Sequence, residues 1–138
     1  EAYSVSFSSA EIKKMKDNIL THNHPRGWSA KKNNIKHVGS SFSENDLRMA
    51  INADLLEIRA VGPLYTYSMQ RPSKGWGVTD KDFRQAYNVA NNAVRRQLLQ
   101  AIKDEQITLD QAEAIHFHLV SKRIAKKYGW KYRKAKTR

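Results

Sequence analysis

The spacing of the hydrophobic residues changes once along this chain, near residue 75, and this change constrains the fold more than any other feature. Before it, apolar and polar residues alternate over short runs, which is typical of half-buried strands. After it, apolar residues recur every three or four positions over long runs, which is typical of helices packed on a core. The sequence therefore predicts an α+β fold, with a small mixed or antiparallel sheet and short helices followed by two C-terminal helices.

Local signals in the first half place its elements. Strands are predicted at residues 3–7, 18–21, 57–61 and 65–69, with a Gly-Pro turn between the last two. Two capping boxes, Ser8 with Glu11 and Ser43 with Asp46, begin short helices that run to about residues 16 and 54. The first half therefore reads as alternating strands and short helices.

The second half contains two long helices after a loop at residues 71–77. The first helix is capped near Thr79, and its apolar stripe is Phe83, Ala86, Tyr87, Ala90, Val94 and Ala101. The second begins near Thr108, buries Ile115, Leu119 and Ile124, and ends at Gly129, a residue type that favours helix C-termini. We expect one domain over residues 1–138, made of a core at 3–72, a helical extension at 78–130 and a mobile basic tail at 131–138.

The composition excludes several classes of protein. No apolar run approaches the ~20 residues that span a membrane, and no N-terminal segment resembles a signal peptide. Cysteine is absent, so disulfides and thiolate metal sites are excluded. This composition is compatible with the cytoplasm and with delivery as a toxin fragment, and the start at Glu1 without a methionine suggests a fragment or a released domain.

The positive charge is concentrated in the second half. The chain carries a net charge of +12, of which residues 71–138 contribute +10, and residues 120–138 hold nine basic residues and no acidic one. Such a field attracts nucleic acid or an acidic protein partner such as an immunity protein; a solvated helix face with a frayed tail is the plainer interpretation. The candidate nucleic-acid-binding residues are Lys31, Lys32, Arg95, Arg96, Lys122, Arg123, Lys126 and Lys127.

Aromatic residues interleave with the last of these basic residues. Tyr128, Trp130 and Tyr132 would suit RNA or DNA binding. Tyr128 and Trp130 could equally close the final helix onto the core.

A candidate metal site begins at His22-Asn23-His24-Pro25. Two imidazoles near the end of a strand, with the carboxylate of Asp46, suit Zn²⁺ and leave a fourth position for water. Ser43 would then hydrogen-bond that water or a developing oxyanion. His-x-His often occurs by chance, and Ser43-x-x-Asp46 is also explained as a helix cap.

These residues resemble the JAMM motif of the JAB/MPN metallopeptidases, which reads His-x-His-Pro, six residues, then Ser-x-x-Asp. Here 17 residues separate Pro25 from Ser43, but excising an apparent insert at residues 28–38 leaves six. The resemblance covers residues 3–72 and is greatest to the JAB-like segments of phage Mu-F-type head-morphogenesis proteins and of polymorphic toxins. It implies a zinc hydrolase of peptide or isopeptide bonds, with His22, His24 and Asp46 on the metal and Ser43 supporting the oxyanion.

The family also uses an upstream glutamate as its general base. Only Glu1 and Glu11 precede the histidines, and Glu11 is the candidate within the chain although it also belongs to a capping box. The base would otherwise lie upstream of residue 1.

Two other functions remain open. One is a basic nuclease toxin that cleaves RNA or DNA and uses His116 or His118; these two side chains point about 200° apart on a helix and cannot easily share a metal. The other is a binding module that kept the fold and lost the catalysis. The insert at residues 28–38, with three lysines and Trp28, would contact an acidic substrate or fold back on the core.

Overall fold

The computed structural model describes residues 8–23 and 41–137, apart from the side chain of His22. The helices are α1 (Ser9–Met15), α3 (Glu44–Asn52), α4 (Asp80–Lys103) and α5 (Leu109–Tyr128), and the strands are β1 (Ile19–Asn23), β2 (Glu57–Val61), β3 (Tyr65–Gln70) and β4 (Lys131–Lys136). This arrangement confirms the predicted α+β class. The predicted strand at residues 3–7 and the insert at residues 28–38 lie outside the described residues.

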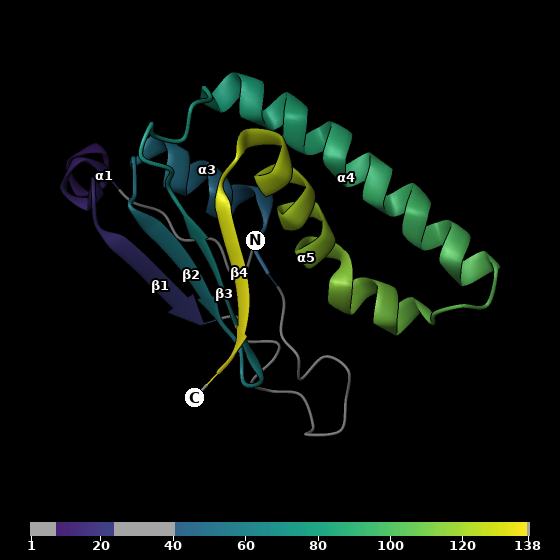
Figure 1. The fold of residues 1–138 in the computed structure, drawn as a ribbon. Coiled ribbons are helices and arrows are strands. Elements are labelled where there is room, and N and C mark those ends of the chain that lie inside the picture. The colour runs from purple at the N-terminus through teal and green to yellow at the C-terminus, as the bar shows by residue number, and fades with distance from the viewer. Residues whose placement is uncertain (1–7, 24–40, 138) are drawn as a thin grey trace.

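The described strands form one mixed sheet in the order β1-β2-β3-β4. β1 and β2 are parallel, while β2 with β3 and β3 with β4 are antiparallel. α3 contacts β2, α5 contacts β4, and α4 packs on both α3 and α5. Figure 1 shows the sheet on the left, with α5 and then α4 beside it on the right.

Alternation along the central strands explains which face of the sheet the helices cover. In β2, Ile58 and Ala60 are buried while Arg59 between them is exposed. In β3, Tyr67 and Met69 are buried and pair with Ala60 and Ile58. Because alternate residues of a strand point to opposite faces, these four residues form the floor of the core.

The helix boundaries follow the capping signals in the sequence. Ser8, Ser43 and Thr108 each accept a hydrogen bond from the backbone three residues ahead, and each capping box is complete. α5 ends at Gly129, whose backbone is left-handed (φ 72°). None of the described helices is both long enough and apolar enough to cross a bilayer.

The expected mobile tail is wrong for residues 131–136, which form β4. This strand pairs with β3 over its whole length, from Tyr65↔Lys136 to Gln70↔Lys131. Four of its six residues are Lys or Arg, and its one aromatic residue, Tyr132, points inward. The sequence therefore lacks the alternation of apolar and polar residues by which a strand is recognised. An edge strand needs only one buried face, and charged residues are common on such strands.

Two tryptophans join the loop at residues 71–77 to the end of α5. The rings of Trp76 and Trp130 meet edge to face with centroids 4.8 Å apart, and both side chains are buried. The Trp130 indole donates to the Trp76 carbonyl (2.8 Å), and the Trp76 indole donates to the Leu55 carbonyl (3.0 Å). Trp130 also stacks on Phe83, so one hydrophobic core runs through both halves of the chain.

Two arginines form ion pairs between elements at the periphery of this core. Arg71 bonds to Asp17 (2.6 Å) and Asp54 (3.0 Å), which ties α1 to the segment after α3. Arg48 makes two bonds to Asp80 (2.9 and 3.3 Å), which ties α3 to the first turn of α4. These ion pairs fix α3 between β2 and α4.

Candidate functional site

The first predicted metal ligand lies near the end of an edge strand of the described sheet. His22 is the fourth residue of β1, and its backbone is in register with Ala60 of the parallel strand β2. The His22 side chain and the whole of His24 fall outside the described residues. The pairing of these two imidazoles therefore stays a prediction.

The other half of the predicted site is the first turn of α3. The Ser43 hydroxyl accepts from the Asp46 backbone N–H (3.2 Å), and the Asp46 carboxylate accepts from the Ser43 backbone N–H (3.0 Å). Asp46 is partly buried. Since a carboxylate offers about four lone-pair positions, this capping bond leaves Asp46 the chemical capacity of a metal ligand.

A buried tyrosine from α4 lies close to this turn. The Tyr87 hydroxyl is buried and makes no hydrogen bond to any of the described residues. Burial raises the pKa of Tyr87, and the nearby charges of Glu44 and Asp46 raise it further. Tyr87 is therefore a neutral hydroxyl in the electric field of the α3 carboxylates, a neighbour that the sequence did not indicate.

Glu11, the candidate general base, has a structural role in the described chain. Its carboxylate accepts from the Ser8 backbone N–H (2.9 Å), which closes the capping box of α1. This bond lowers the pKa of the Glu11 carboxyl, and the residue is exposed. Both properties make Glu11 a poorer base than a carboxylate in a dry cleft.

The described part of the chain contains no group of three His, Cys, Asp or Glu side chains that could hold a metal. His24 and the His22 ring lie outside the described residues, so the predicted set of His22, His24 and Asp46 stays a prediction.

The basic candidates divide between two grooves on opposite sides of α5. Lys122 and Lys126 line a pocket of ≈ 450 Å³ between α5 and β4. Arg123 and Lys127 line a second pocket of ≈ 460 Å³ between α4 and α5, beside Asp82. Arg95 and Arg96 are exposed on α4, and Lys31 and Lys32 lie outside the described residues.

The two helical histidines have different partners. His116 makes a hydrogen bond of 2.6 Å to Asn91 of α4, while His118 Nδ1 makes one of 2.8 Å to the Tyr132 hydroxyl of β4. Burial lowers the pKa of both rings, helped by Arg95 for His116 and by Lys134 and Lys122 for His118. A nuclease that uses either histidine stays a prediction.

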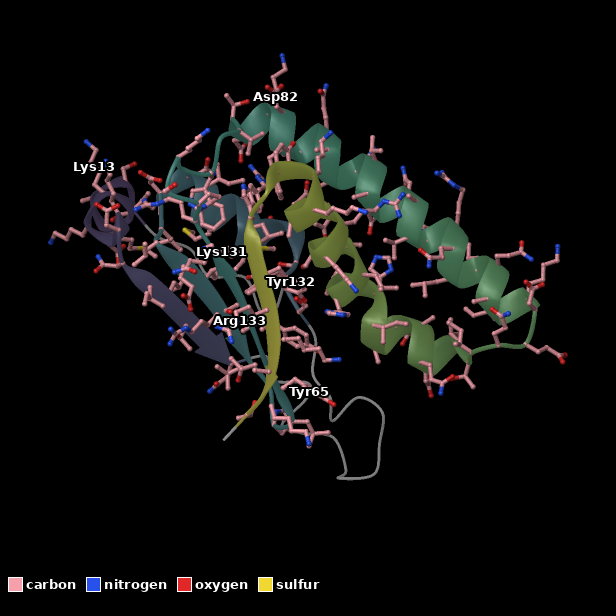
Figure 2. All side chains as sticks on the ribbon, viewed as in Figure 1. Lys13, Tyr65, Asp82, Lys131, Tyr132 and Arg133 are labelled. Atoms are coloured by element: carbon pink, nitrogen blue, oxygen red, sulfur yellow. The ribbon has the colours of Figure 1, made fainter. Side chains whose placement is uncertain are left out.

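Tyr132 links His118 to two buried serines. Its hydroxyl is 2.7 Å from Ser41 Oγ, and Ser41 Oγ donates to Ser121 Oγ at 3.4 Å. Figure 2 shows Tyr132 on the side of β4 toward α5, with Lys131 and Arg133 on the other side. The sequence is compatible with Tyr132 stacking on bases, whereas the structure places its side chain at the floor of the pocket.

Trp130 is a core residue rather than a surface for bases, being 5% exposed. Tyr128 is half-buried and stacks on it (5.1 Å between centroids). Of the two sequence interpretations, the structure supports closure of the final helix onto the core.

Comparisons with protein-family models, curated proteins and solved structures found no match for this chain. Any functional inference therefore rests on the geometry above and on the motif.

Proposed function

We propose that this chain is a JAB-like zinc metallohydrolase module that acts on peptide or isopeptide bonds. His22, His24 and Asp46 would hold the metal, and Ser43 would stabilise the oxyanion. The motif that suggests this activity also suggests its setting, a phage-derived protein or a toxin domain.

The observation that supports this proposal is the connection from β1 through α3 to β2. The end of α3 lies beside the start of β1, because the Asp17 N–H donates to the Asp54 carbonyl (3.0 Å) and the Leu56 N–H to the Asn18 carbonyl (2.9 Å). α3 spans about 13 Å at 1.5 Å per residue and contacts β2, the parallel neighbour of β1. Its first turn is therefore expected toward the edge of the sheet where β1 ends, one residue before His24, as is common for sites in sheets with parallel strands.

The donor set suits the proposed metal. Two neutral imidazoles and one carboxylate are typical ligands of catalytic Zn²⁺, which lowers the pKa of bound water to ~7 and polarises a carbonyl. The Ser43 oxygen accepts the Asp46 N–H, so its own O–H can donate to a substrate oxygen. We leave Glu11 out of the proposed chemistry because its carboxylate already caps α1.

Zinc content measured by elemental analysis tests the proposal without depending on activity. The purified chain, equilibrated with zinc and freed of excess by gel filtration, should retain one zinc per chain. His24→Ala and Asp46→Asn should each lower zinc affinity by about 10-fold or more, since the loss of a ligand costs at least as much as the loss of a supporting residue. Asp46→Asn preserves the side-chain oxygen that accepts the Ser43 N–H, so the helix cap should survive.

Glu44→Gln is the matched control, because Glu44 is a second carboxylate in the same turn of α3. It should retain zinc like the unmodified chain. A chain that binds no zinc, or an Asp46→Asn variant that binds it normally, would show that the proposed site is wrong.

A further inference from the structure

The pocket between α5 and β4 is lined by none of the proposed metal ligands, and its chemistry is different. We call it the α5–β4 pocket and define it by His118, Lys122, Lys126, Trp130, Tyr132 and Lys134. α5 supplies the first three residues, β4 the last two, and Trp130 lies in the turn between them. The pocket therefore forms only when β4 has paired with β3.

The lysines of this pocket are not neutralised by acids of the described chain. The described salt bridges use Lys16, Arg48, Arg59 and Arg71, and none uses a lysine of the pocket. Lys122 and Lys126 lie one turn apart on α5, and both are exposed. Lys134 lies over the ring of Tyr65, 4.2 Å from its centroid, which holds that ammonium on the strand.

The floor of the pocket is polar, and its side chains are linked by hydrogen bonds. Because Ser41 donates to Ser121, the Tyr132 hydroxyl donates to Ser41, and its oxygen then accepts from His118 Nδ1. In this arrangement His118 carries its proton on Nδ1 and turns Nε2 away from Tyr132. An imidazole that offers Nε2 as an acceptor, set among ammonium groups, suits an anion that also carries hydroxyl groups better than an apolar ligand.

Cations repeat along the α5 wall of the pocket and continue along β4 beyond it. Lys122 and Lys126 are separated by about 6 Å along the helix axis. On β4, Lys134 lines the pocket, and Lys136 lies beyond the pocket on the same face of the strand, about 7 Å from Lys134. Such rows fit a linear chain of repeated negative charges better than a single small ion, and a recessed groove fits one strand better than a flat membrane surface.

We propose that the α5–β4 pocket binds the phosphodiester backbone of a single-stranded nucleic acid. Lys122, Lys126 and Lys134 contact successive phosphates, and His118 Nε2 accepts a hydrogen bond from a sugar hydroxyl. This binding is independent of the proposed zinc site.

Fluorescence anisotropy with a labelled 12-nucleotide RNA tests this proposal against general attraction to a basic protein. The pocket variant is Lys122→Gln/Lys126→Gln/Lys134→Gln. The matched control is Lys13→Gln/Lys74→Gln/Lys103→Gln, which removes the same charge from three exposed lysines on α1, the 71–77 loop and the end of α4. All six positions are exposed, so both variants should fold, which a thermal melt verifies.

The pocket variant should bind the RNA at least about 10-fold more weakly, and the control within about 3-fold of the unmodified chain. The slope of log affinity against log salt should fall by roughly 2 in the pocket variant, at about 0.7 per lost phosphate contact on a single strand. Asp46→Asn should bind the RNA normally even if it binds no zinc.

Several outcomes would overturn the proposal. One is equal loss in the two triple variants, which would mean unspecific attraction. Others are no binding of the RNA by the unmodified chain, or tighter binding of poly-glutamate or of anionic vesicles than of the RNA. Amide chemical shifts give an independent readout: the RNA should shift Gly129 and Lys134 more than residues of α1, and unshifted amides there would contradict the pocket.

Discussion

At the scale of single residues, the buried polar side chains show how hydrogen bonds stabilise this fold. Ser41 and Ser121 are at most 1% exposed, and a buried hydroxyl without a partner is costly. The Tyr132 hydroxyl provides a hydrogen-bond partner for Ser41, and it also bonds to His118. Burial, with the nearby charges of Lys134 and Lys122, lowers the pKa of the His118 ring.

Acidification should weaken the fold through His116 and His118. Above the unfolded-state pKa of ~6.5 both rings are neutral in either state. Because the folded-state pKa of each is lowered, the unfolded chain binds protons first as the pH falls, so the free energy of unfolding decreases below about pH 6.5. The loss is at most about 1.4 kcal/mol per pH unit for each histidine.

Urea unfolding at pH 7.5 and 5.5 measures this effect. The double variant His116→Asn/His118→Asn should lose less stability between the two pH values than the unmodified chain. Equal losses in the two proteins would mean that the two histidines do not titrate differently on unfolding.

At the scale of the elements, the ends of the helices were predictable because their signals are local. The capping boxes at Ser8, Ser43 and Thr108 and the stop at Gly129 each involve residues within one turn. The β2 strand and its turn into β3 also follow from a short alternating pattern. β4 was not predictable in this way, because its residues pair with residues of β3 that lie 61 to 71 positions earlier, and its four basic residues obscure the alternating pattern.

Substitution of Gly129 tests the end of α5. Gly129→Ala should lower the free energy of unfolding by about 1–2 kcal/mol, because a Cβ disfavours the left-handed backbone. A Cβ there would meet no other atom within 4 Å, so the cost is conformational rather than steric. Gly129→Asn, which tolerates this backbone better, should lose less in the same urea experiment. The reverse order would contradict the assigned left-handed cap.

At the scale of the whole molecule, both halves of the chain share one core. The sequence alone predicts residues 78–130 as an extension of a core at 3–72. The structure instead packs Phe83, Val94 and Ile124 in the same hydrophobic cluster as Leu47 and Ile58. Periodicity indicates which face of a helix is buried but not its partner, so this shared packing could not be derived from the sequence.

The two candidate sites also differ in how far the sequence alone could predict them, because contacts between distant segments are not visible in it. The metal motif was visible because its residues are adjacent in sequence or fall at caps. The α5–β4 pocket was only partly visible, since Lys122 and Lys126 were identified as basic candidates but Lys134 and the His118–Tyr132 bond depend on β4.

Removal of residues 131–138 tests whether β4 belongs to this shared core. A mobile tail would be dispensable, whereas loss of β4 should lower the free energy of unfolding by about 3 kcal/mol or more, as when a large aromatic is removed from a core. The control, Lys131→Gln/Arg133→Gln/Lys134→Gln/Lys136→Gln, removes the charges but keeps the strand. It should unfold in urea close to the unmodified chain, and a truncated chain of equal stability would disprove the role of β4.

The pairing of β4 with β3 also affects how this protein folds during its synthesis. β3 is synthesised before α4 and α5, whereas its partner β4 is synthesised after them. The backbone N–H and C=O groups along one edge of β3 therefore lack their hydrogen-bond partners until β4 has been made. Until residue 136 has left the exit tunnel, that edge can recruit a strand from another nascent chain. The late, lysine-rich partner strand thus also closes a surface through which unfinished copies would aggregate.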